Sequence, residues 1–216
     1  MLYLIGGGHG FNNKIGEDFK VTLNDKKSIV FIPTMPGNKE KCEKYKTINL
    51  KWFEEVGITF NDIEIIDLED TPDMAKNKIN KKEIIFLMGR DPISQLNLIR
   101  DKQLENDLKE SKAIIIGVSA GALSICQKCI ITKDEDYPQN MVLDGLNLTK
   151  GLNIEVHYNC EHDLDINRIM KDYKIEKIYG IPENCAIKLE NNTTKFIGNE
   201  KFYLFRNGNK EEVKTY

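Results

Sequence analysis

Short apolar runs recur along the chain, and helical patterns lie between the early ones. The runs that predict strands are 2–5, 28–33, 64–67, 84–88, 113–118, 154–156, 177–181, 185–189, 195–198 and 202–207. In 39–56 and 94–110 the apolar residues instead recur every three to four positions, which predicts helices. Strands that alternate with helices favour parallel pairing, with crossover helices on both faces of one sheet.

The pattern changes from about residue 177 onward. Short strand-like runs are separated there by turns that read "EN", "ENN", "GN" and "NGN", which predicts antiparallel strands at one edge of the sheet. We therefore predict a single α/β domain over residues 1–216, built as a three-layer sandwich. Its central sheet is mostly parallel with helices on both faces, and the C-terminal part adds an antiparallel extension.

One predicted junction between a strand and a helix contains a candidate catalytic motif. Strand 113–118 runs into "GVSAG", in which Ser119 lies between two glycines, and 120–127 suits a helix. A sharp G-x-S-x-G turn exposes its serine above the sheet edge as a nucleophile, and the next backbone N–H can face a developing oxyanion. A plain turn in which Ser119 caps the helix gives the same pattern.

Charge and composition argue against several classes of function. The 31 basic and 34 acidic residues give a net charge of −3, which provides no basis for attraction to nucleic acid. No stretch approaches the roughly 20 apolar residues of a membrane helix, and the first apolar run is too short for a secretion signal. We therefore expect a cytoplasmic protein with reduced cysteines. We also expect no metal site, because Cys126 and Cys129 have no second pair of ligands at zinc-site spacing.

A second glycine-rich segment, Gly6 to Gly10, follows the first strand. Its spacing does not match the dinucleotide-binding fingerprint, and the following "FNNKIGEDF" is a poor start for an amphipathic helix. We expect a close-packed loop under the active site and no nucleotide cofactor.

A serine nucleophile needs a base, and the chain offers His9, His157 and His162. His157 follows the strand-like run 154–156, where its side chain can face the same sheet edge as Ser119, so it is the predicted base. His162 lies in the polar segment "NCEHDLD", which we expect to be solvated.

The base in turn needs a carboxylate that holds its tautomer. The order Ser, acid, His that is found in α/β-hydrolases favours Asp134 or Asp144. Glu183 follows a strand-like run, which gives the order Ser, His, Glu instead. The pattern alone leaves this choice open.

Four segments in order resemble the peptidase E family, which holds the aspartyl dipeptidases and cyanophycinase: "FLMG…QLNLIR", "GVSAGA", "HYN" and "GIPENCAI". The resemblance extends from "LYLIGGG" to "NGN" near the end. It implies a glutamine-amidotransferase-like fold and a serine peptidase acting on short peptides. Matched segment by segment, it makes Ser119 the nucleophile, His157 the base and Glu183 the family's glutamate, and it places a retained aspartate at Asp134.

The segment "GRDP" at 89–92 departs from the Gly-Gly-Gly-Asn run that is usual in the family. The N–H of the retained Gly89 would complete an oxyanion hole with that of Ala120, whereas the larger side chains after it would reshape the pocket. An N-terminal Asp preference, which the resemblance implies, requires a cation near the pocket. Arg90 and Arg168 are the candidates, because a guanidinium binds a carboxylate through two parallel hydrogen bonds.

The sequence thus predicts a serine dipeptidase that acts as a monomer or homodimer without a cofactor. We favour Glu183 over Asp134 as the acid that orients His157, because Asp134 lies in a polar loop that is better suited to shaping the pocket. Two alternatives remain: a member of the same fold that lost turnover and acts as a sensor or binding module, and an esterase of the α/β-hydrolase type.

Overall fold

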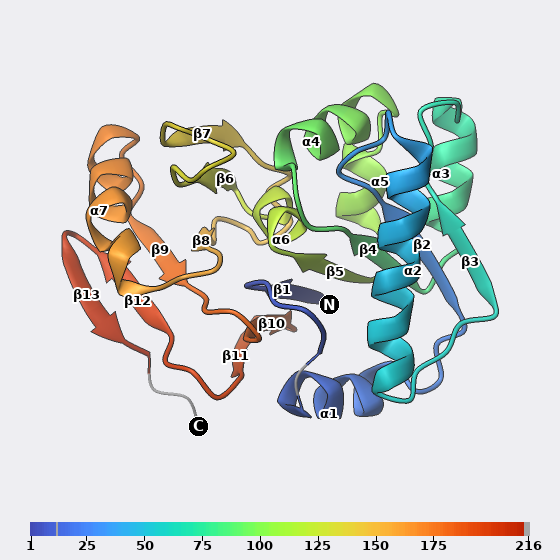
Figure 1. The fold of residues 1–216 in the computed structure, drawn as a ribbon, viewed down its shortest axis with the longest axis horizontal. Coiled ribbons are helices and arrows are strands. Elements are labelled where there is room, and N and C mark those ends of the chain that lie inside the picture. The colour runs from blue at the N-terminus through green and yellow to red at the C-terminus, as the bar shows by residue number, and fades with distance from the viewer. Residues whose placement is uncertain (12, 214–216) are drawn as a thin grey trace.

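The computed structural model describes residues 1–11 and 13–213, and a seven-stranded sheet forms its centre (Figure 1). The strand order is β11-β10-β1-β5-β4-β2-β3. The parallel strands are β1 (Leu2–Ile5), β2 (Ser28–Ile32), β3 (Asp62–Ile65), β4 (Ile84–Leu87) and β5 (Ile114–Val118). Because β5 pairs with both β1 and β4, the strand that leads to Ser119 lies in the interior of the sheet.

Helices cover both faces of this sheet, which confirms the predicted layers. One face packs against α1 (Asn13–Thr22) and α2 (Lys39–Glu55). The other face packs against α3 (Pro72–Asn80), α4 (Pro92–Asp101), α5 (Glu105–Glu110) and α6 (Ala120–Ile125). Strand β4 shows how the two cores form: Ile84 and Phe86 belong to the first core, whereas Ile85 and Leu87 belong to the second. Successive side chains of a strand point to opposite faces, so a strand buried on both sides is apolar throughout.

The C-terminal part divides between two sheets. Strands β10 (Ala186–Glu190) and β11 (Thr193–Ile197) continue the central sheet in antiparallel fashion, as predicted. A separate sheet contains β8 (Ile154–Glu155), β9 (Lys177–Gly180), β12 (Tyr203–Arg206) and β13 (Asn209–Glu212). The helix α7 (Asp163–Asp172) packs on this second sheet (Figure 1). The short helix η1 (Cys160–His162) precedes it. Strands β6 (Lys128–Ile131) and β7 (Met141–Asp144) form a hairpin.

Several helices differ from the sequence-based expectation. The expected helix 94–110 is two helices, because the chain turns between α4 and α5, where Gln103 has a φ of 56°. Helix α6 ends at Ile125, two residues before the expected end. Helices α1, α3 and α7 were not predicted. Thr71 starts α3 by accepting a hydrogen bond from the N–H of Met74, with a proline at the first helical position. Within the described residues, no helix has the length and apolar character to cross a membrane.

Candidate active site

Ser119 lies at a strained elbow between β5 and α6. Its backbone has φ 51° and ψ −114°, a conformation that non-glycine residues rarely adopt. The Ser119 N–H donates to the carbonyl of Ile5 at 2.8 Å, which fixes the elbow to β1. Ser119 occupies the N-cap position of α6, but its side chain makes no capping hydrogen bond, so the alternative in which the serine side chain caps the helix is wrong.

The two glycines of the motif are required by close packing. A Cβ atom at Gly117 would lie 2.6 Å from the backbone nitrogen of Ala122. A Cβ atom at Gly121 would lie 2.1 Å from the carbonyl oxygen of Leu87, in the neighbouring strand β4. Both distances are far below contact distance, so the elbow can form only with glycine at these positions.

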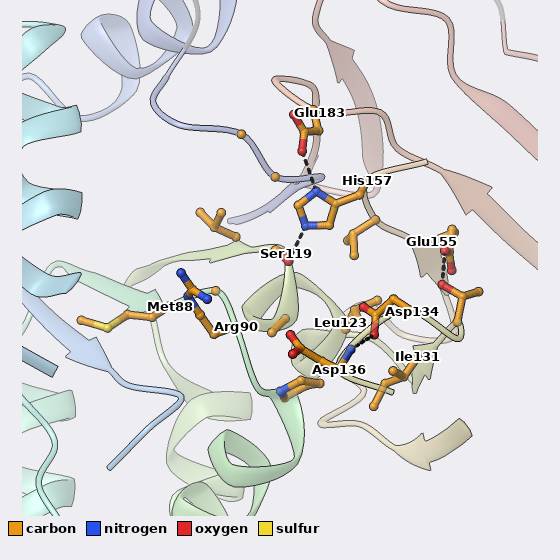
Figure 2. A pocket seen from close by; sticks show the side chains of 18 of the residues that line it. Met88, Arg90, Ser119, Leu123, Ile131, Asp134, Asp136, Glu155, His157 and Glu183 are labelled. Carbon is orange, nitrogen blue, oxygen red and sulfur yellow. Dashed lines mark hydrogen bonds and ion pairs between the residues drawn. The ribbon is translucent and has the colours of Figure 1, made fainter. Parts of the chain in front are cut away.

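His157 lies two residues after the end of β8, and its ring meets the serine. Ser119 Oγ lies 2.7 Å from His157 Nε2 (Figure 2). The N–H of His157 donates to the carbonyl of Gly6 at 2.7 Å. Gly7 has a φ of +129°, and a Cβ atom there would lie 2.1 Å from His157 Cε1. The loop that follows β1 therefore forms a close-fitting support for the histidine ring, as expected from the sequence.

Glu183 reaches the other nitrogen of this ring from the loop after β9. His157 Nδ1 and Glu183 Oε1 are 3.0 Å apart, and Figure 2 shows the serine, histidine and glutamate in one line. The same glycine loop holds this segment, because the N–H of Asn184 donates to the carbonyl of Gly7 at 2.9 Å. The His157 and Glu183 side chains are 43% and 52% exposed, so solvent reaches this pair.

The other candidate acids have different partners. Asp134 lies between β6 and β7, and its Oδ1 accepts the N–H groups of Asp136 at 2.9 Å and Tyr137 at 2.7 Å. Asp144 pairs with Lys128 at 2.6 Å. Asp134 lines the same cavity as Ser119, but its carboxylate stabilises the turn of its own loop. The carboxylate beside His157 is that of Glu183.

Gly89 follows β4 and lies directly against the elbow. A Cβ atom at Gly89 would be 3.6 Å from the Cβ of Ser119. Two buried side chains hold this segment: Thr34 donates to the carbonyl of Gly89 at 2.7 Å, and Gln95 donates to that of Met88 at 3.2 Å. Our sequence analysis did not single out either residue, although each is a polar side chain among apolar neighbours. They fix the backbone at the position expected for one oxyanion donor.

Ala120 is the first residue of α6, so its N–H has no acceptor within that helix. Among residues 1–11 and 13–213, no backbone carbonyl in a turn, loop or helix cap accepts a hydrogen bond from the N–H of Ala120 or from that of Gly89. Both residues line the cavity around Ser119. The two groups are therefore available to an oxygen atom that develops negative charge at the elbow.

The cavity around Ser119 measures about 900 Å³ and extends to both sides of the elbow. On one side Arg90 has a φ of 116° and its guanidinium lies 5.0 Å from the centre of the Tyr45 ring. Arg168 lies on α7 instead, 66% exposed and 3.7 Å from Asp165, and it does not line the cavity. Of the two arginines considered for the pocket, the structure brings only Arg90 to it.

Asp91 is the next residue of the unusual segment 89–92. Its side chain makes contacts that connect two parts of the cavity wall. Its side chain caps α4 by accepting from the N–H groups of Ile93 and Ser94. The Tyr137 hydroxyl donates to Asp91 Oδ1 at 2.7 Å, which links the loop between β6 and β7 to the start of α4. Burial raises the pKa of Asp91, but the hydrogen bonds from Ser94 and Tyr137 outweigh it, and the pKa lies below its usual value.

A second pair of a histidine and a carboxylate lines the far side of the cavity. His162 Nδ1 lies 2.8 Å from Glu155 Oε1, and the Thr132 hydroxyl donates to the same oxygen at 2.6 Å. The expectation that His162 is solvated is wrong, because its side chain is only 27% exposed and is held by Glu155. Burial raises the pKa of Glu155, and the hydrogen bond to Glu155 raises that of His162.

The C-x-x-C cysteines lie inside the core. Burial raises the pKa of Cys129 to about 12 and that of Cys126 well above its usual value, so both are protonated thiols. Within the described part of the chain, no group of three or more His, Cys, Asp or Glu side chains is arranged to hold a metal ion.

Comparison with known proteins matches most of the chain to one family. The model of "Peptidase family S51" matches residues 2–197. Peptidase E from Nostoc sp. is 24% identical over 202 residues, which cover 88% of this chain and 79% of that protein.

Two solved structures share the fold. A peptidase from an acI-B1 actinobacterium has a TM-score of 0.67 at 16% identity, over 99% of this chain and 93% of that one. A Listeria monocytogenes EGD-e protein assigned to peptidase E has a TM-score of 0.66 at 20% identity, over 90% of this chain and 96% of that one.

Proposed function

The chain belongs to peptidase family S51, and on that premise we propose that it is a serine-type dipeptidase whose nucleophile is Ser119. The observation that carries the proposal is the unbroken line of hydrogen bonds at the elbow. Ser119 Oγ is 2.7 Å from His157 Nε2, and His157 Nδ1 is 3.0 Å from Glu183 Oε1. This is the arrangement in which a neutral imidazole can accept the serine proton while a carboxylate holds its other N–H.

In the proposed reaction, Ser119 Oγ attacks the carbonyl carbon of the scissile peptide bond and His157 takes the hydroxyl proton. The carbonyl oxygen becomes an oxyanion that accepts hydrogen bonds from the N–H groups of Gly89 and Ala120. Collapse of this intermediate breaks the C–N bond, and His157 returns the proton to the leaving amine. A water molecule, deprotonated by His157, then hydrolyses the ester on Ser119 and restores the free serine.

The strained elbow supports this role. Ser119 is held in place by a hydrogen bond to Ile5 and by glycine packing on both sides, so its hydroxyl is positioned before substrate binds. A nucleophile that is already oriented loses little freedom on reaching the transition state.

For the substrate we propose short peptides with a free N-terminus, and N-terminal Asp is the leading preference. The support is the charge of Arg90, whose exposed guanidinium lines the cavity near Gly89. A guanidinium binds a side-chain carboxylate through two hydrogen bonds, which a neutral side chain cannot replace.

The test is hydrolysis of a dipeptide library by purified protein and by a Ser119→Ala variant. We expect the wild type to cleave Asp-X dipeptides and the variant to be inactive at a nearly unchanged melting temperature, because removing one hydroxyl from an elbow removes no packing. Undiminished turnover in the variant would make Ser119 structural. Equal rates on neutral N-terminal residues would remove the acidic preference, and cleavage of simple esters without peptides would favour an esterase.

A further inference from the structure

We infer that Glu155 is a specificity-determining residue that binds the free α-ammonium group of the substrate's N-terminal residue. This inference rests on the proposed function, since it names what the same site recognises. Glu155 ends β8 only two residues before His157, and it lines the cavity that contains Ser119. Glu155 is also near enough to His157 for the two side chains to interact electrostatically.

The first support is the burial of this carboxylate. The Glu155 side chain is only 2% exposed. A buried carboxylate is costly unless hydrogen bonds or an opposite charge compensate for the lost water. Thr132 and His162 supply this compensation at one oxygen of the carboxylate only.

The second support is the way its hydrogen bonds are distributed. The Thr132 hydroxyl at 2.6 Å and His162 Nδ1 at 2.8 Å both meet the same atom, Glu155 Oε1. No residue in 1–11 or 13–213 has a hydrogen bond to Oε2. Thr132 and His162 thus fix the orientation of the carboxylate and leave its second oxygen for a donor that enters the cavity. An ammonium group is such a donor, with a charge that matches.

The third support is the distribution of charge around the cavity. Asp134 and Asp136 line the cavity together with Glu155. Lys44 and Lys133 also line the cavity, but the ammonium group of Lys133 pairs with Asp165 at 3.3 Å. Figure 2 shows Arg90 and Glu155 on opposite sides of Ser119.

The ammonium group of an N-terminal residue would supply the donor that Glu155 Oε2 lacks. A blocked N-terminus would leave Glu155 Oε2 without a charged donor, and a site built to hydrogen-bond a substrate group binds poorly an analogue that lacks it.

The experiment compares one dipeptide with a free N-terminus and the same dipeptide with an acetylated N-terminus. We expect the wild type to prefer the free amine. In Glu155→Gln, kcat/KM for the free peptide should fall about 10- to 100-fold, the size of a lost hydrogen bond to a charged group, while that for the acetylated peptide stays the same. The matched control is Glu161→Gln, an exposed carboxylate on η1 outside the cavity lining, which should keep the wild-type ratio.

Labelling of Ser119 by a fluorophosphonate separates this inference from the proposed function, because the label has no amine. If Ser119 is labelled at the wild-type rate in Glu155→Gln and the preference for the free amine persists, the role of Glu155 is refuted and the serine chemistry stands. If the wild type cleaves both peptides equally, the inference also fails.

Should Glu155→Gln not fold, protection of the wild type against labelling gives the answer. Aspartic acid amide should slow the labelling and N-acetylaspartic acid amide should not. Equal protection by the two amides would overturn the inference.

Discussion

Replacing Glu183 with glutamine removes the negative charge that faces His157 while keeping almost the same shape. The 3.0 Å contact with His157 Nδ1 is a hydrogen bond to a charged group, and such bonds contribute about 1.5 to 3 kcal/mol. Because Glu183 is 52% exposed, water screens the pair, and we expect the lower end of that range. At 1.36 kcal/mol for each factor of ten, kcat should fall about 10- to 30-fold. In a serine protease whose corresponding acid is buried, replacing that acid lowers kcat by up to about 10⁴-fold.

The assay is steady-state hydrolysis of one dipeptide by Glu183→Gln and by Asp134→Asn. KM should stay the same in Glu183→Gln, because the imidazolium that Glu183 stabilises forms only as the reaction proceeds. Asp134→Asn should affect kcat less, since Asp134 holds its own loop through the N–H groups of Asp136 and Tyr137. The reasoning is refuted if Asp134→Asn loses more kcat than Glu183→Gln, because the orienting role would then belong to Asp134.

Two further predictions concern the support of the site and the stability of the fold. Gly7→Ala should lower kcat about 100-fold by displacing the His157 ring, which a new Cβ would approach to 2.1 Å. Gly57→Ala, with a φ of +81° but nothing within 4 Å, should leave kcat unchanged, and equal kcat in the two variants would contradict this account. For Asp18, burial raises the pKa, but hydrogen bonds led by that of Lys195 outweigh it and lower the pKa below 3.8. Its stabilisation is therefore present above pH 3.8 and is lost as the pH falls through the lowered value. In urea titrations, the wild type should lose more unfolding free energy than Asp18→Asn on acidification, and parallel losses would exclude this role.

The central sheet could be predicted from the sequence because its strands are buried on both faces. Strands such as β4 and β5 are continuous apolar runs, and a run of that kind has few alternatives once the helices between the strands are recognised. Helix α3 escaped prediction because its sequence is mostly polar, with only Ala75 and Ile79 buried. The second sheet could not be predicted either, since β8, β9 and β12 come from distant parts of the chain and nothing local specifies their pairing.

The same division holds for the site. Ser119, His157 and Glu183 were named from motif and position, because each lies within three residues after the end of a strand. Glu155 was not named as a site residue, because a glutamate in a short strand is typical of a solvent-facing position. His162 was set aside because it lies in a polar segment. Their contact depends on η1, which turns the chain so that His162 reaches back to β8.

The most direct test of the central claim is the site of covalent labelling by a fluorophosphonate. Intact-mass spectrometry of the wild type should show a single adduct, and peptide mapping should place it on Ser119. The Ser119→Ala variant should gain no mass under the same conditions. An adduct on another residue, or an equal adduct in Ser119→Ala, would contradict the assignment of Ser119 as the nucleophile.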